Sequence, residues 1–119
     1  MDQDKLAQNR IQNAILLAKL VNWKFVNTNE NVSWNKGRFQ YIDITADITL
    51  TFSNPSAGTT YVLKFNNPDG HTITWPSNCR WPGGYIPSTG ICYVGFLYID
   101  NISSQYYDNI ALAEDLQII

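Results

Sequence analysis

The spacing of apolar residues changes once along the chain, near residue 26. Over residues 3–25 apolar side chains recur at steps of three and four, which is typical of an amphipathic helix. Neither glycine nor proline interrupts this segment, and Asp2 and Asp4 lie where the helix dipole favours acidic side chains. Over residues 41–52 apolar and polar residues alternate one by one, which is the period of a half-buried strand. The pattern predicts a helix followed by a β body.

The predicted helix carries an apolar face with the a/d spacing of a coiled coil. Its members are Ile11, Ala14, Ala18, Val21 and Phe25, and the face is widened by Leu6, Leu17 and Leu20. Such a face either packs across the sheet of its own domain or joins the chain to copies of itself or to a partner. A coiled coil takes three or more heptads, and this segment offers fewer. Both interpretations stay open, and the face is a candidate oligomer or anchor face.

The first β segment, residues 41–52, is either one strand or two strands bent near Ala46. One side of it is apolar and consists of Ile42, Ile44, Ala46, Ile48, Leu50 and Phe52. The next strand, residues 59–65, places Tyr61, Leu63 and Phe65 on one face. The turn "NNPDG" then leads to "HTITW", because proline presets φ and Asp-Gly tolerates positive φ. We expect these two strands to form a hairpin.

The last strong β signal is residues 91–99, "ICYVGFLYI", which is apolar on both faces and is expected to be a central strand covered on both sides. Residues 103–110 indicate a last short strand or turn, and the tail is either a helical turn or an exchanged strand. Since every connection is short, we expect antiparallel pairing. The fold class is mainly β: an N-terminal α-helix followed by a small antiparallel β-sandwich. The expected divisions are a helix (1–26), a linker or first strand (27–40), the sandwich (41–107) and a tail (108–119).

Charge is sparse in this chain. Charged residues make up 15% of the 119 positions and the net charge is −2, which argues against a nucleic-acid-binding surface. The polar surface comes from Asn, Thr, Ser and Gln, and such a weakly repulsive surface suits a protein that is built into an assembly. The segment "AILLAKLV" is too short for a membrane span, and no secretory signal is visible.

Catalytic chemistry finds little support in the sequence. Asp43 and Asp47 lie along one predicted strand, about 13 Å apart, and we expect them to keep that face hydrated. His71 is the only histidine and has no evident carboxylate partner. Cys79 and Cys92 are expected to be buried thiols, with a disulfide as the alternative. We predict a protein that is not an enzyme, with no catalytic, cofactor or metal site.

Residues 72–84, "TITWPSNCRWPGG", concentrate tryptophan, proline and glycine. Trp75 ends the strand in phase with Ile73, so we expect it in the core. Trp81 has two interpretations, a second core residue or an exposed platform for a sugar ring. In the second case Trp81 and Tyr85 would stack on a glycan, with Asn78 and Arg80 as the polar rim.

The β body resembles a small domain found in structural proteins of tailed-bacteriophage particles. The residues that carry the resemblance are "ADITLTFSNPSAGTTYVLKF", then "HTITWPSNCRWPGGYIP", then "VGFLYI" and the Tyr106-Tyr107 pair. It spans about residues 46–107, and the N-terminal helix and the tail lie outside it.

The resemblance implies a structural component of a phage particle: a head fibre, a capsid decoration or a short tail-fibre subunit. Its helix would attach the chain and its β domain would be displayed. The implied partners are other copies of the chain, with a trimer favoured, and other virion proteins. The implied location is the virion, assembled in the cytoplasm of the host bacterium. The alternative function is a carbohydrate- or host-receptor-binding module, whose partner would be a glycan of the host surface.

Overall fold

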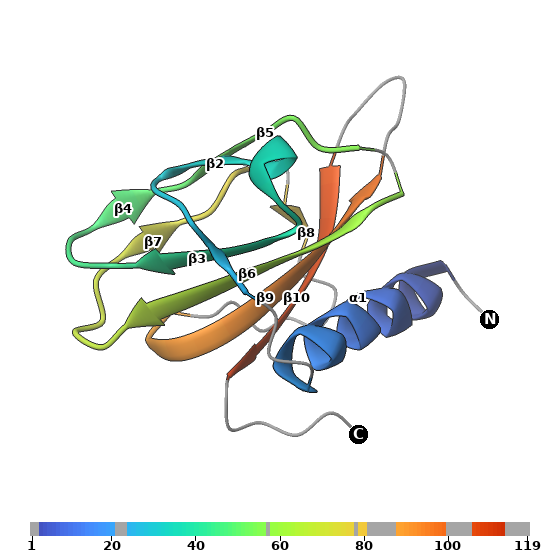
Figure 1. The fold of residues 1–119 in the computed structure, drawn as a ribbon, viewed down its shortest axis with the longest axis horizontal. Helices are drawn as coiled ribbons and strands as arrows, with labels where there is room; N and C mark the ends of the chain where they lie inside the picture. Colours follow the sequence, from blue (N-terminus) through green and yellow to red (C-terminus); the bar gives the residue numbers. More distant parts are fainter. Residues whose placement is uncertain are drawn as a thin grey trace.

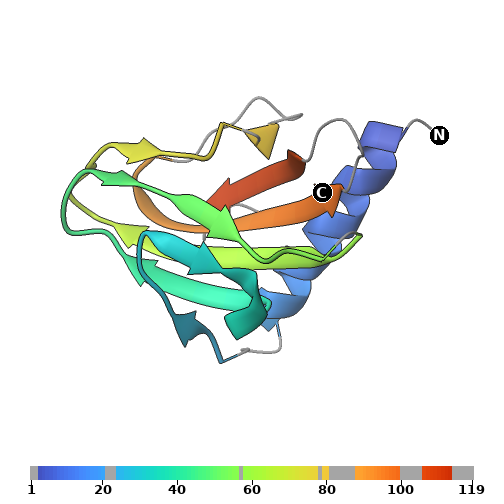
Figure 2. The ribbon, with the colours of Figure 1, turned by 90° about the horizontal axis from the view of Figure 1, so that it is seen from above.

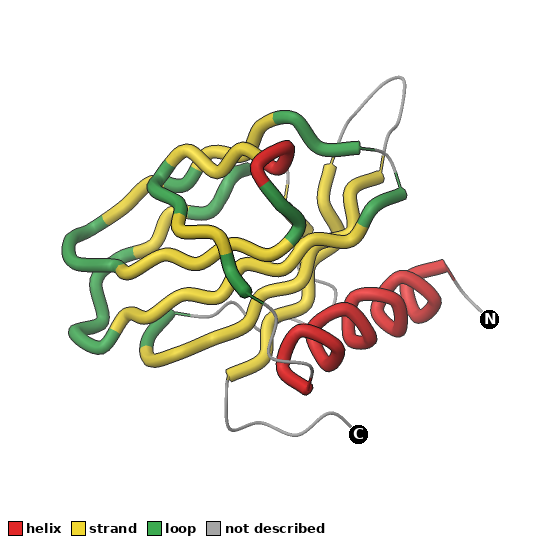
Figure 3. Tube along the Cα trace, in the orientation of Figure 1, coloured by secondary structure: helices red, strands yellow, loops and turns green. Residues whose placement is uncertain are grey.

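A computed structural model describes residues 3–20, 24–56, 58–77, 79–80, 88–99 and 106–113, with the backbone alone given for residues 3–8, 80, 99 and 106–113. One α-helix precedes ten strands and a single 3₁₀ turn in this part of the chain (Figures 1 and 3). The elements are α1 (Gln3–Leu20), β1 (Val26–Asn27), β2 (Asn31–Ser33), η1 (Trp34–Lys36), β3 (Phe39–Asp43), β4 (Ile48–Thr49), β5 (Thr51–Ser53), β6 (Thr60–Asn67), β7 (Ile73–Thr74), β8 (Cys79–Arg80), β9 (Gly90–Ile99) and β10 (Tyr106–Ala113). The prediction of a mainly β chain that begins with a helix is confirmed.

The strands form three layers together with the helix. A six-stranded sheet with the order β1-β3-β6-β9-β10-β8 lies in the middle. Helix α1 packs on one face of this sheet, and the short strands β2, β4, β5 and β7 lie over the opposite face (Figure 1). Strands β4 and β5 follow one another along one line, with β7 on one side of that line and β2 on the other (Figure 2).

Most strand pairs are parallel, so the predicted antiparallel arrangement is wrong. Five of the seven pairs in the described residues are parallel, and only β6–β9 and β9–β10 are antiparallel. The physical reason is the route of the chain. The connections that follow β1, β3 and β6 carry it from the central sheet to the outer layer. The chain then returns beside its own starting strand, so that β6 lies parallel to β3.

The expected hairpin around residues 66–70 is also absent. Gly70 adopts a φ of 68°, as the predicted turn requires. Strand β7, however, pairs with β4, and Ile73 lies beside Ile48. Asn67 redirects the chain: its buried Oδ1 accepts a hydrogen bond from the amide of His71 at 3.0 Å, and its Nδ2 donates to the carbonyl of His71 at 2.8 Å. This pair of bonds directs the chain into the outer layer.

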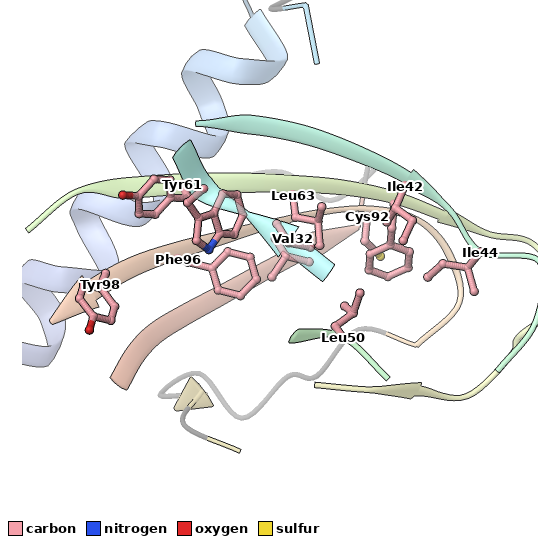
Figure 4. Packing of buried hydrophobic residues seen from close by; sticks show 12 residues of the cluster. Val32, Ile42, Ile44, Leu50, Tyr61, Leu63, Cys92, Phe96 and Tyr98 are labelled. Carbon is pink, nitrogen blue, oxygen red and sulfur yellow. The ribbon is translucent and has the colours of Figure 1, made fainter. Parts of the chain in front are cut away.

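The larger hydrophobic core lies between the central sheet and the outer strands (Figure 4). Trp34 is buried in it, with its ring stacked on that of Tyr61 at a centroid distance of 4.6 Å and in edge contact with Phe52. The buried members of this core are Val32, Trp34, Ile42, Ile44, Leu50, Tyr61, Leu63, Phe65, Cys92, Val94, Phe96 and Tyr98. Tyr61, Leu63 and Phe65 therefore share a face, as predicted.

The smaller core lies between the central sheet and α1. It contains Ile11, Ala14, Ile15, Ala18, Phe39, Val62, Tyr93 and Leu97. Strand β9 contributes to both cores, because Val94 and Phe96 face the outer strands whereas Tyr93 and Leu97 face the helix. The prediction of a central strand covered on both sides is confirmed.

The segment 41–52 bends where the sequence allowed a bend. Strand β3 ends at Asp43 and β4 begins at Ile48, with a bend at Ala46. The alternation still holds, because Ile42, Ile44 and Leu50 are buried whereas the intervening Asp and Thr side chains are exposed. Ala46 is the exception and is exposed. Strand β10 runs through to Ala113, across the boundary expected between residues 107 and 108.

The strand register separates the two cysteines. Cys79 lies beside Tyr107 of β10, and Tyr107 lies beside Tyr98 of β9. Cys92 is six residues further along β9, which corresponds to about 20 Å. A disulfide needs Cα atoms within about 7 Å of each other. Both residues are accordingly thiols, Cys92 buried and Cys79 half-buried.

Candidate functional site

The candidate oligomer or anchor face of the helix is occupied by the protein's own sheet. Ile11, Ala14 and Ala18 are at most 8% exposed and pack against Phe39 and other residues of the central sheet. Phe25 is half-buried and contacts the rings of Phe39 and Tyr93 edge to face, whereas Val21 lies outside the described residues. The assignment of this face to oligomerisation or anchoring is therefore wrong: it is the intramolecular face of α1.

The opposite face of α1 exposes apolar side chains. Leu16, Leu17 and Leu20 are 38%, 46% and 73% exposed. Leu16 and Leu20 continue a line that begins with Asn9 and Asn13, both exposed, at spacings of four, three and four residues. Residues with this spacing share one side of a helix. The outer line, defined as Asn9, Asn13, Leu16 and Leu20, carries no charge.

Side-chain hydrogen bonds hold the loop that contains the "SNPSAG" segment. Asn54 adopts a positive φ of 59°, and its Nδ2 donates to Ser33 Oγ at 2.9 Å. The hydroxyl of Tyr61 accepts a hydrogen bond from the amide of Ser56 at 2.7 Å. Arg10 of α1 donates to the carbonyl of Gly58 at 2.7 Å. These bonds give the segment a structural role, in which it carries the chain from β5 back to β6.

The tryptophan-rich stretch is described only in part. Trp75 is half-buried and packs on the larger core, with ring contacts to Phe65 and Phe96 at centroid distances of 6.1 and 6.2 Å. It therefore faces the core, as predicted, but is only half-buried there. The proposed glycan contacts Trp81, Tyr85 and Asn78 lie outside the described residues. Arg80 belongs to β8, and only its backbone is given.

The acidic residues of the first β segment are exposed, as predicted, and they also make specific contacts. Asp47 Oδ1 accepts a hydrogen bond from the amide of Thr72 at 2.9 Å. The same oxygen lies 3.8 Å from Nδ1 of His71, so the histidine does have a carboxylate neighbour, contrary to expectation. Because Asp47 is 77% exposed, this pair contributes little energy and chiefly positions two connecting loops.

Beside Asp43 the surface is hollowed. A groove of about 450 Å³ lies between the crossing segment, residues 28–31, and the end of β3. Ile42 and Ile48 supply its apolar lining, and Asp43 borders it. Asp43 also borders a second hollow of about 250 Å³, whose lining includes Asn66 and Asp69.

Two amides of the groove are held in fixed orientations. The Oδ1 atom of Asn29 accepts a hydrogen bond from the amide of Asn31 at 2.9 Å. The Oδ1 atom of Asn31 in turn accepts from Thr51 Oγ1 at 3.2 Å. With both amide oxygens engaged by the protein, the donating Nδ2 groups are left to face other partners.

Two further polar groups of the groove have defined states. The Oγ1 atom of Thr28 is enclosed and has no hydrogen-bond partner among the described residues. Asp43 accepts a hydrogen bond from the hydroxyl of Tyr41. That bond, together with burial, raises the pKa of Tyr41 above its ordinary value. The Tyr41 hydroxyl thus stays protonated and holds the Asp43 carboxylate at the border of the groove.

Sequence reasoning missed this groove. Its residues 28–31 read "TNEN", a polar run in the segment where the helical period gives way to the strand period. Such a run is typical of any surface loop. Only the crossing from β1 to β2 beside the end of β3 brings Glu30 and Asp43 to one hollow, and no local pattern encodes that crossing.

Comparison of the chain with protein-family models, with curated proteins and with solved structures gave no match. Within the described residues, no helix is both long and apolar enough to cross a membrane. That same part of the chain brings together no group of three or more His, Cys, Asp or Glu side chains that could hold a metal ion.

Proposed function

We propose that this protein is a non-enzymatic structural subunit of a bacteriophage particle. It forms a homo-oligomer through the outer line of α1 and displays its β body. The observation that carries the proposal is the two-sided helix: one apolar face packs on the sheet, and Leu16 and Leu20 are exposed on the other. The sequence resemblance of residues 46–107 to a virion domain supports the setting.

Energetics favour a partner for the outer line. Fully burying a leucine side chain contributes about 1.5–3 kcal/mol relative to leaving it in water. Leu20 is 73% exposed, so most of this stabilisation would be gained only when an association step buries the side chain. An exposed leucine is common by itself, but Leu16, Leu17 and Leu20 are adjacent on one helix face.

A second copy of this chain is the occupant that fits best. The outer line has no charge, so two or three copies would meet without like-charge repulsion. Asn9 and Asn13 both donate and accept, and the same amide on another copy is a suitable partner. Asparagine at the seam of a helical bundle typically sets register and oligomer order. A trimer is the expected order, in line with the resemblance.

Light scattering of the full chain tests the assembly step. We expect an oligomer for the natural chain and a monomer for the double variant Leu16→Glu/Leu20→Glu. The matched control is Thr45→Glu/Thr49→Glu, which adds the same charge at two exposed residues outside the helix and should stay oligomeric. All three chains should keep the same circular dichroism. A monomeric natural chain, or an oligomer that survives both leucine substitutions, overturns the proposal of self-association.

A second experiment tests whether the protein is part of the phage particle. Purified particles of the phage that encodes the chain should contain it at a fixed stoichiometry by quantitative mass spectrometry. Particles produced with the double leucine variant should contain much less of it. If the chain is abundant in infected cells and missing from purified particles, it is not a virion subunit.

A further inference from the structure

The groove between the crossing segment and the end of β3 has a composition unlike a plain loop surface. It combines two carboxylates, those of Glu30 and Asp43, with the amides of Asn29 and Asn31 and with an apolar lining. The four polar side chains are exposed, so a ligand can reach them. The groove is formed by strands and loops of the β body, at a distance in sequence from the outer line of α1. A ligand in this groove is therefore independent of the proposed function.

The four polar side chains of the groove alternate between hydrogen-bond donors and acceptors. The carboxylates of Glu30 and Asp43 only accept. The amides of Asn29 and Asn31 have their oxygens engaged by the protein and present N–H donors. A hydroxyl group both donates and accepts, so neighbouring hydroxyls on a sugar ring match such an arrangement. The fixed amides also mean that little side-chain entropy is lost on binding.

The charge of the groove selects against other ligand classes. Among the described residues no Lys, Arg or His lines it, whereas two carboxylates do, so phosphates and other anions are repelled. For a divalent cation, the described residues bring together no group of three or more His, Cys, Asp or Glu side chains that could hold one. The volume of about 450 Å³ falls in the range of small-ligand sites.

We propose that this groove binds a neutral saccharide, with Glu30 and Asp43 accepting hydrogen bonds from ring hydroxyls. Asn29 and Asn31 donate to the hydroxyl or ring oxygens, and Ile48 contacts the apolar side of the sugar. The enclosed Thr28 hydroxyl, which has no partner in the described chain, is the group that a bound hydroxyl or its bridging water would satisfy. The second hollow, which shares Asp43, accommodates the next sugar unit.

The experiment is a titration of the isotope-labelled full chain, followed by amide chemical shifts. The probes are galactose, glucose, mannose and N-acetylglucosamine, with sialic acid as the anionic probe and arginine methyl ester as the cationic one. We expect saturable shifts at residues 28–31, 42–43 and 48 with at least one neutral sugar. Sialic acid should produce none, because Glu30 and Asp43 repel its carboxylate.

Isosteric variants identify the contacts. Glu30→Gln and Asp43→Asn keep shape and remove the charged acceptor, and each should weaken binding of the responsive sugar about tenfold. Asp69→Asn is the matched control, since Asp69 lies in the second hollow and does not reach a monosaccharide in the first. It should leave the affinity unchanged.

Three results overturn the proposal: no saturable shift with any neutral sugar, shifts with arginine methyl ester alone, or equal affinities in Asp43→Asn and the natural chain. The second result would make the groove a cation site instead. None of these outcomes bears on the oligomer, which is measured separately by light scattering. Conversely, the leucine variants leave the groove residues untouched, so the two proposals can fail independently.

Discussion

Ile11 of α1 lies directly over Gly95 of β9, so closely that even a single added methyl group on the glycine would clash with the isoleucine. A Cβ atom at Gly95 would also lie 2.9 Å from the Cδ1 atom of Ile15, which is closer than real Cβ contacts come. The helix therefore approaches the sheet at Gly95, where β9 has no side chain in the way. This contact explains why α1 packs on the central sheet as part of the same domain.

Gly95→Ala should destabilise the protein by about 1–3 kcal/mol, because the added methyl group overpacks the smaller core. Chemical denaturation measures this change in the free energy of unfolding. In an Ile11→Ala background the same substitution should cost less, since the nearest of the clashing groups is gone and only the contact with Ile15 remains. Equal costs in the two backgrounds would mean that Ile11 does not sit over Gly95.

The Tyr61 hydroxyl fixes the loop between β5 and β6. It accepts a hydrogen bond from the amide of Ser56, and Tyr61 is only 3% exposed. Tyr61→Phe leaves the Ser56 N–H without its acceptor, so we expect a loss of about 1–2 kcal/mol in the free energy of unfolding. The exchange rate of the Ser56 amide hydrogen should increase by more than the change in the free energy of unfolding predicts. Tyr98→Phe, another buried tyrosine on the same side of the sheet, is the comparison in which exchange at Ser56 should follow the global change alone.

The local sequence patterns predicted which helix and strands form better than they predicted which strands pair. The steps of three and four identified α1, and the alternation through Ile42, Ile44 and Leu50 identified a strand that bends near Ala46. The apolar residues on both faces of the segment 91–99 also predicted that β9 is covered on both sides. These signals depend only on which side chains face a core, and that is a property of the local sequence.

Pairing was not predictable in the same way. Short connections usually join antiparallel neighbours, but most of those between the described strands join different layers. Asn67 shows why the sequence misled. The turn "NNPDG" has the composition of a hairpin turn, yet its buried asparagine binds His71 and sends the chain to β7. The groove was missed for the same reason, because it exists only where the crossing segment meets the end of β3.

Cys79 and Cys92 should form no disulfide with each other under oxidising conditions, because the strand register places them about 20 Å apart. The folded protein is exposed to oxidised glutathione and then unfolded without a reducing agent. Its intact mass should not show the loss of two hydrogens that an internal disulfide causes. A thiol reagent should label half-buried Cys79 faster than buried Cys92 in the native chain. An intramolecular Cys79–Cys92 disulfide in the folded protein would contradict the register of β8 against β10.

Tyr41 should titrate above the ordinary value for a tyrosine, chiefly because its hydroxyl donates to Asp43. A raised pKa in the folded state means that the contribution of Tyr41 to stability is fully present below the unfolded pKa. It is lost as the pH rises through the folded pKa. The tyrosinate absorbance of the natural chain should therefore rise later than that of Asp43→Asn. Superimposable alkaline titrations of the two chains would show that the bond to Asp43 is not maintained in solution.

Thr28→Val separates a structural from a binding role for the enclosed hydroxyl of the groove. Valine keeps the shape of threonine and removes an oxygen that has no partner in the described chain. Without sugar, we expect the free energy of unfolding to stay constant or to rise by up to about 1 kcal/mol. Binding of the responsive sugar should nevertheless weaken several-fold. Thr49→Val, at an exposed threonine, should change neither quantity. If Thr28→Val lowers stability and leaves binding intact, the hydroxyl serves the fold and not a ligand.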